Sequence, residues 1–188
     1  FSSMAVDILS SMVSVMQYES TQALLNLTNS VPFLLNAVQT LQRNDADKCL
    51  NSILCLMNGT DYLQIWVKGG LIPVVIDYLR KNDSDMGTYC LWAIVAGGTD
   101  CVTACLEAGL EDVLRKLLTC GLSLVESAAR NCAMHVLLEC KTEDLVELAS
   151  SPAFFIAASR VAPISPQLLR TWSRMLWLGT QLMRENGD

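Results

Sequence analysis

The segment Gly70-Leu71-Ile72-Pro73-Val74-Val75 decides the fold of this chain of 188 residues. A glycine at the end of one helix can take a left-handed conformation and turn the chain sharply. Proline is favoured in the first turn of the next helix, where a backbone N–H has no intrahelical partner. The segment therefore predicts a glycine hinge, with one helix ending before Gly70 and another starting just after it.

The same hinge recurs along the chain with a period near forty residues. Pro32 precedes Pro73 by 41 residues, and Pro152 follows it by 79, which is close to two periods. Asp112 stands where the intermediate proline is expected, and Gly109 lies 39 residues after the first hinge glycine. Aspartate also suits a first turn, because the positive end of the helix dipole attracts its charge. The period predicts a solenoid of repeated units.

A longer apolar helix is expected after each of these hinges. Five stretches carry apolar residues at i, i+3, i+4 and i+7, which predicts helices with a wide buried face. They are Ser20–Leu27, Leu50–Leu56, Tyr89–Ile94, Asn131–Leu137 and Leu169–Leu176. The polar linkers 44–47 and 82–85 are expected to supply N-capping side chains for two of them. No stretch shows strand alternation, so the sequence predicts an all-α chain.

These phrases resemble armadillo repeats, whose units read as a short helix ending in Gly, then Ile-Pro-x-Leu-Val, then Ala-x-x-Ala-Leu-x-Asn-Leu. Residues 70–75 match the middle phrase, residues 23–27 match the last, and Trp92-Ala93-Ile94 is similar to the usual Trp-Ala-Leu. The resemblance implies a right-handed α-solenoid, an armadillo-like superhelix of three-helix repeats. HEAT repeats share the period and are the near neighbour.

The resemblance covers nearly the whole chain as a single armadillo-like repeat domain, residues 1–188. The expected units are approximately 1–29, 30–59, 60–98, 99–140 and 141–188. Because the first residue is Phe1 rather than Met, we expect the chain to be a fragment of a longer protein.

Armadillo proteins bind peptides or protein segments in a concave groove lined by the third helices, and importin-like members use a ladder of Trp and Asn four residues apart. The positions equivalent to the ladder Trp are Gln22, Asn51, Trp92 and Cys132, and those equivalent to the ladder Asn are Asn26, Cys55, Ala96 and Val136. No unit carries both ladder residues, so we expect a less regular contact surface. The candidate groove residues are Gln22, Asn26, Asn51, Trp92 and His135.

Composition narrows the classes of partner. The chain is 52% hydrophobic and 17% charged, with a net charge of -6, and its basic residues are scattered, which argues against direct nucleic-acid binding. Its apolar stretches are shorter than the ~20 residues that a membrane-spanning helix needs. The eight cysteines fall mostly inside apolar helical patterns, so we expect reduced thiols and a cytoplasmic or nuclear protein.

Catalytic motifs are weak. His135 is the single histidine, and no nucleophile elbow or phosphate-binding loop accompanies it. Cys132, His135 and Cys140 lack the paired spacing of structural zinc sites, so we expect no catalytic residue, metal or cofactor. The sequence favours a non-catalytic scaffold that binds a peptide or helix of another protein. The alternatives are a self-association or capping module that uses the apolar segment 4–16 and, more remotely, a helical metal-dependent enzyme.

Overall fold

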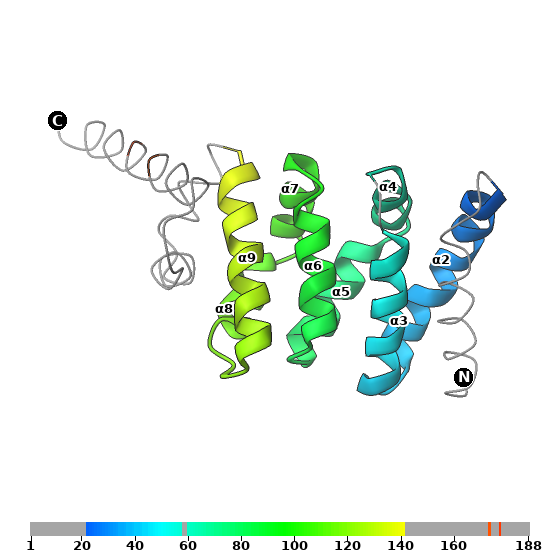
Figure 1. Cartoon of the computed structure of the whole chain (residues 1–188), viewed down its shortest axis with the longest axis horizontal. Helices are drawn as coiled ribbons and strands as arrows, with labels where there is room; N and C mark the ends of the chain where they lie inside the picture. Colours follow the sequence, from blue (N-terminus) through cyan, green and yellow to red (C-terminus); the bar gives the residue numbers. More distant parts are fainter. Residues whose placement is uncertain (1–21, 58–59, 142–172, 174–176, 178–188) are drawn as a thin grey trace.

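The computed structural model describes residues 22–57, 60–141, 173 and 177 (Figure 1). Over 22–57 and 60–141 the chain forms eight α-helices and no strand, which confirms the predicted all-α class. The helices are α2 (Gln22–Thr40), α3 (Arg43–Leu56), α4 (Thr60–Lys68), α5 (Leu71–Lys81), α6 (Asp85–Val95), α7 (Thr99–Glu107), α8 (Leu110–Leu117) and α9 (Ser123–Glu139).

The helices stack as successive units with two main layers (Figure 1). The longer helices α3, α6 and α9 lie side by side and pack against one another in that order. Behind them, α2 packs on α5 and α5 packs on α8. The short helices α4 and α7 precede α5 and α8, so α4–α6 and α7–α9 are two equivalent three-helix units. The predicted order of short, medium and longer helix is confirmed in both.

The two predicted glycine hinges are confirmed. Gly70 has φ 96° and Gly109 has φ 91°, both in the left-handed region, and each directly precedes a helix, α5 or α8. Pro73 lies in the first turn of α5, and Asp112 lies in the first turn of α8, as the period predicts. The left-handed glycine lets the short helix end and the next one leave in a new direction.

The predicted hinge at Pro32 is wrong. Helix α2 runs through Pro32 from Gln22 to Thr40, so the predicted third helix over residues 20–27 is not a separate element. The two residues before Val31 are Asn29 and Ser30, so no glycine is available to take the left-handed conformation. Counted back 41 residues from α4 and α5, α2 corresponds to a first and a second helix joined into one.

One predicted linker is confirmed and the other is wrong. Before α6 the chain is extended, and the hydroxyl of Ser84 caps the helix by accepting a hydrogen bond from the N–H of Gly87 at 2.9 Å. Residues 44–47 instead lie inside α3, which begins at Arg43 after an N-cap residue, Gln42, whose side chain makes no capping bond. Asp45 stands in the first turn of α3, where its charge is also favoured. The same residue types suit a linker and a first turn, so composition alone does not separate them.

The core lies between the two layers. Trp66, Leu91 and Leu114 are each 0% exposed, and six of the eight cysteines are buried among similar apolar side chains. All eight cysteines lie in the described part of the chain, and none of them forms a disulfide bond. The prediction of reduced thiols that pack as small hydrophobic groups is therefore confirmed for these residues.

Polar contacts join successive units. The Cys90 thiol in α6 donates to the carbonyl of Leu50 in α3 at 3.2 Å. The Lys116 ammonium in α8 donates to the carbonyl of Leu79 in α5 at 2.9 Å, and so satisfies a carbonyl at the C-terminal end of that helix. Each unit therefore completes the hydrogen bonding of the unit before it as well as covering its apolar face.

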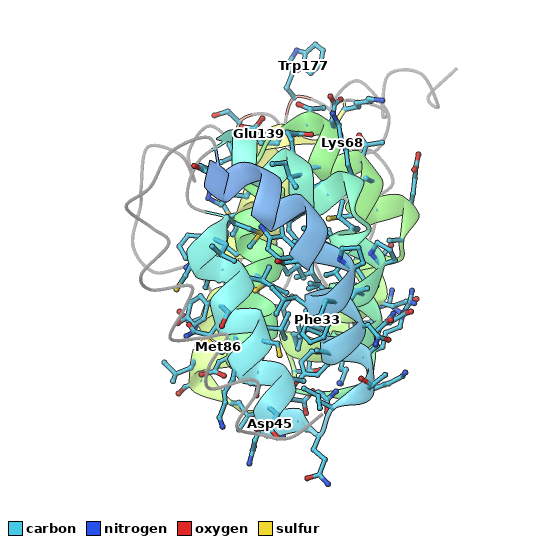
Figure 2. All side chains as sticks on the ribbon, turned by 90° about the vertical axis from the view of Figure 1, so that its right-hand side faces the viewer. Phe33, Asp45, Lys68, Met86, Glu139 and Trp177 are labelled. Carbon is cyan, nitrogen blue, oxygen red and sulfur yellow. The ribbon has the colours of Figure 1, made fainter. Side chains whose placement is uncertain are left out.

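Figure 2 views the stack from the α2 end, with α2 and α3 in front. Phe33 on α2 is 38% exposed, one of the few large apolar side chains of the described residues that reach solvent. The apolar segment 4–16, which the sequence analysis assigns to self-association, lies outside the described residues.

Candidate functional site

The helices α3, α6 and α9 present equivalent positions to solvent. In each helix a buried pair is followed by a side chain that is exposed or half-buried: Cys49-Leu50 by Asn51, Cys90-Leu91 by Trp92, and Cys132-Ala133 by Met134. The step from α3 to α6 is 41 residues, and the step from α6 to α9 is 42 residues. This burial pattern defines which side chains share one face.

The ladder equivalents expected in the last of these helices are wrong by two positions. Cys132 and Val136 are both 0% exposed and point into the core. Met134 and Leu138, which are half-buried, occupy the solvent-facing positions instead. The linker before α9 spans residues 118–122, whereas the linker before α6 spans only 82–84, so matching of sequence motifs did not give the register.

We define the central strip as the partly or fully exposed side chains in the middle of these three helices. They are Lys48, Asn51 and Cys55 of α3, Tyr89, Trp92, Ala93 and Ala96 of α6 or its C-terminal end, and Asn131, Met134, His135 and Leu138 of α9. Its middle is an aromatic cluster. The ring centroids of Tyr89 and Trp92 are 6.4 Å apart, and those of Trp92 and His135 are 6.1 Å apart.

Three of the five predicted groove residues lie in this strip. Asn51 is exposed, and Trp92 and His135 are half-buried and in contact across α6 and α9. Gln22 and Asn26 lie in the N-terminal half of α2, where the side chains are outside the described ones. Their assignment assumed a third helix over residues 20–27, and the structure has no separate helix there.

Sequence reasoning missed several strip residues, including Tyr89, Asn131 and Met134. The signal was present in the buried Cys-Leu pairs at 49–50 and 90–91, which recur as Cys132-Ala133. Aligning the units on these pairs, rather than on the hinge prolines, places the missed residues beside Asn51 and Trp92.

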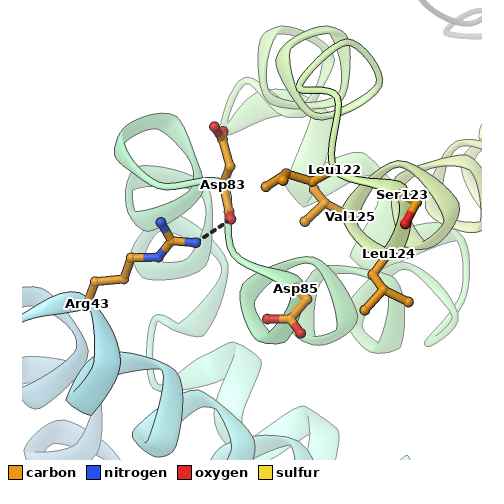
Figure 3. A pocket seen from close by; sticks show the side chains of 7 residues that line it. All are labelled: Arg43, Asp83, Asp85, Leu122, Ser123, Leu124 and Val125. Atoms are coloured by element: carbon orange, nitrogen blue, oxygen red, sulfur yellow. Dashed lines mark hydrogen bonds between the residues drawn. The ribbon is translucent and has the colours of Figure 1, made fainter.

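A pocket adjoins the strip near the starts of α6 and α9 (Figure 3). Its volume is about 240 Å³, and its lining residues are Arg43, Asp83, Asp85, Leu122, Ser123, Leu124 and Val125. The Arg43 guanidinium donates a hydrogen bond to the carbonyl oxygen of Asp83 at 2.7 Å. Leu122 is 46% exposed and Leu124 is 62% exposed, so one wall of the pocket is apolar.

Two further searches were confined to the part of the chain that the structure describes. Within it, no three or more His, Cys, Asp and Glu side chains are grouped so that they could hold a metal ion. Within the same residues, no helix combines the length and the apolar character needed to cross a membrane.

The sequence matches no protein-family model and no curated protein sequence. Solved structures do match. A designed armadillo repeat protein in complex with the peptide (KR)4 aligns with a TM-score of 0.66 and 15% identity over 96% of this chain and 84% of that chain. An engineered protein aligns with a TM-score of 0.69 and 16% identity over 94% and 72% of the two chains.

A third match belongs to computationally designed armadillo repeat proteins for modular peptide recognition. It has a TM-score of 0.61 and 14% identity, and covers 90% of this chain and 81% of that chain. Identities this low establish the fold alone. The chain therefore has the fold of an armadillo-like repeat solenoid, as the phrases around Gly70 and Trp92 indicate.

Proposed function

We propose that this chain is a non-catalytic protein-interaction scaffold that binds a peptide or helical segment of a partner protein on its central strip. The observation that carries the proposal is the row formed by Asn51, Trp92 and His135 on three successive helices of one layer. The designed neighbours, one of which is in complex with a peptide, support the view that this fold can act as a peptide-binding scaffold.

The strip offers the two kinds of contact that an extended peptide needs. The exposed amide of Asn51 carries a donor and an acceptor, which can pair with a peptide N–H and carbonyl. The Trp92 indole, flanked by Tyr89 and His135, offers a ring face for an apolar or aromatic side chain. Neither contact requires a reacting group.

The buried thiols support a non-catalytic role. Desolvation raises the pKa of Cys49 to about 11 and that of Cys105 to about 12. Burial likewise raises the pKa of Cys132 well above its ordinary value. A nucleophilic cysteine needs a stabilised thiolate, and these sites favour the neutral thiol. The same thiols suit a reducing compartment, and we place the scaffold in the cytoplasm or nucleus on that ground.

The test is a selection of peptides from a random display library on the chain, followed by affinity measurements on Asn51→Ala/Trp92→Ala. We expect the double variant to lose affinity for the selected peptides by about tenfold or more, equivalent to ~1.4 kcal/mol, while its helical circular dichroism stays unchanged. Gln64→Ala/Glu107→Ala, which changes two exposed residues of α4 and α7, is the matched control and should bind normally.

Trp92→Phe refines the test. The indole Nε1 of Trp92 is shielded from solvent and has no hydrogen-bond partner among the described residues. Phenylalanine therefore keeps a ring on the strip and removes no hydrogen bond, and should retain part of the affinity. Undiminished binding by the Asn51→Ala/Trp92→Ala variant would remove the strip as the binding site.

Self-association is the competing function, with the apolar end of the stack as the contact. Light scattering over a range of protein concentrations separates the two, because a mass that stays at that of one chain disfavours self-association. A metal-dependent activity would require stoichiometric bound metal, which elemental analysis measures.

A further inference from the structure

We propose that the central strip binds a segment rich in aromatic and aliphatic side chains and poor in lysine and arginine. This inference rests on the proposed function, because it assigns a chemistry to the ligand of the same face. It separates this chain from the designed relative whose structure holds the peptide (KR)4.

The first ground is the absence of acidic side chains from the strip. The chain has 19 Asp and Glu residues and a net charge of -6, yet none of the eleven described strip residues is acidic. Its single formal charge is that of Lys48, whose ammonium lies 3.2 Å from Asp45. A lysine or arginine laid along the strip would find no carboxylate there, and Lys48 would repel it.

The second ground is that the carboxylates of the same helices lie near the helix ends and are engaged. Asp47 accepts hydrogen bonds from the hydroxyls of Tyr78 and Ser84. The Asp85 carboxylate accepts from the N–H of Met86 at 2.9 Å, and the Glu126 carboxylate accepts from the N–H of Gly121 at 3.0 Å. These groups serve the fold, and a basic peptide would have to compete for them.

The third ground is the positive match of the strip to apolar groups. Trp92 has an aromatic neighbour on either side, and the half-buried side chains of Met134 and Leu138 extend the surface along α9. Methionine adapts its shape to an incoming side chain and makes favourable contacts with aromatic rings. The exposed amides of Asn51 and Asn131, on α3 and α9, can bind the main chain of a segment that crosses Trp92.

The pocket near the starts of α6 and α9 extends this apolar surface. Leu122 and Leu124 form its outer wall, with Val125 buried behind them. A segment that crosses the strip can place an aliphatic side chain there. The net negative charge of the chain still attracts basic peptides weakly at low salt, but that attraction is screened over ~8 Å at physiological ionic strength.

The experiment compares peptide selections on two proteins at ~0.15 M salt, where surface attraction is screened. One is the native chain, and the other is Ala96→Glu/Asn131→Glu, which adds two carboxylates at exposed strip positions. We expect the native pool to be depleted in Lys and Arg and enriched in Phe, Trp, Leu and Met. The charged variant should enrich Lys and Arg, and should bind (KR)4 about tenfold more tightly than the native chain does.

The outcomes separate this inference from the proposed function. A native pool enriched in Lys and Arg, or tight salt-resistant binding of (KR)4 by the native chain, overturns the inference and leaves the scaffold function standing. A selection that yields no binder to the native chain contradicts the scaffold function, and the inference falls with it. Circular dichroism confirms that the charged variant is folded.

Discussion

The hydroxyl of Tyr78 in α5 donates a hydrogen bond to Oδ1 of Asp47 in α3, 2.8 Å away. Asp47 also accepts a hydrogen bond from the hydroxyl of Ser84, the N-cap residue of α6. Burial, and then the hydrogen bond to Asp47, raise the pKa of Tyr78 well above its ordinary value. One carboxylate therefore ties together three helices from two successive units.

Tyr78→Phe removes this hydrogen bond and keeps the buried ring. Because a hydrogen bond to a charged group contributes about 1.5–3 kcal/mol, we expect a loss of that order in the free energy of unfolding, measured by urea denaturation. Tyr89→Phe is the control, since Tyr89 is half-buried on the strip and its ring, not its hydroxyl, makes the contact with Trp92. Equal losses in the two variants would contradict the role of Asp47.

Capping predicts opposite effects at the starts of α6 and α9. Ser84→Ala removes the cap of α6 and one donor to Asp47, so we expect destabilisation of about 1–2 kcal/mol. At α9 the N-cap residue is Leu122, which has extended backbone angles and makes no side-chain cap. Leu122→Ser should therefore stabilise the chain by about 0.5–1 kcal/mol. Thermal denaturation of both variants measures the difference, and a decrease in stability for Leu122→Ser would argue against the capping account.

The two hinge glycines should differ in their tolerance of alanine. At Gly70 a Cβ would meet open space, so Gly70→Ala should lose only the ~1–2 kcal/mol of the left-handed conformation. At Gly109 a Cβ would meet Nη2 of Arg80, which donates to the carbonyl of Ala108 at 2.8 Å. Gly109→Ala should therefore be more destabilising in urea denaturation.

Arg80→Ala supplies the control for this comparison. In that background the contact is gone, and alanine at Gly70 and at Gly109 should have equal effects. A Gly109→Ala variant that stays the more destabilised in the Arg80→Ala background would show that Arg80 is not the cause.

Buried thiols predict a loss of stability at alkaline pH. The folded chain holds the pKa of Cys49 at about 11 and that of Cys105 at about 12, whereas an exposed thiol ionises near 9.0. The folded state thus binds more protons than the unfolded state above pH 9, and stability falls as pH rises. Each thiol contributes a slope of up to ~1.4 kcal/mol per pH unit between its two pKa values.

Urea denaturation at pH 8 and pH 10, under reducing conditions, measures this loss. The variant Cys49→Ala/Cys105→Ala is expected to be less stable at pH 8 because it lacks two buried side chains, but its stability should fall less between the two pH values. An undiminished fall in the variant would assign the alkaline loss to other groups.

The sequence predicted the elements whose chemistry is local. Gly70, Gly109 and Ser84 each satisfy a backbone requirement at their own position, and the structure has each as predicted. Pro32 misled the prediction because proline is compatible with a helix start and no glycine precedes it, so α2 continues. Local signals therefore located the hinges but did not exclude a continuous helix.

The candidate site was only partly predictable. Trp92 and Asn51 follow from the repeat motif, but the contact of Trp92 with His135 depends on how α6 packs on α9. The longer linker at 118–122 changes the register of α9 by one residue relative to the preceding step, and so brings Met134 rather than Cys132 to the surface. Packing between helices that are far apart in sequence set that register.

The most direct test of the account is backbone amide hydrogen exchange, measured with and without a selected peptide. The account predicts slower exchange in α3, α6 and α9 around Asn51, Trp92 and His135, and unchanged exchange in α5 and α8. Protection confined to α5 and α8, with none in α3, α6 and α9, would contradict the assignment of the central strip as the binding face.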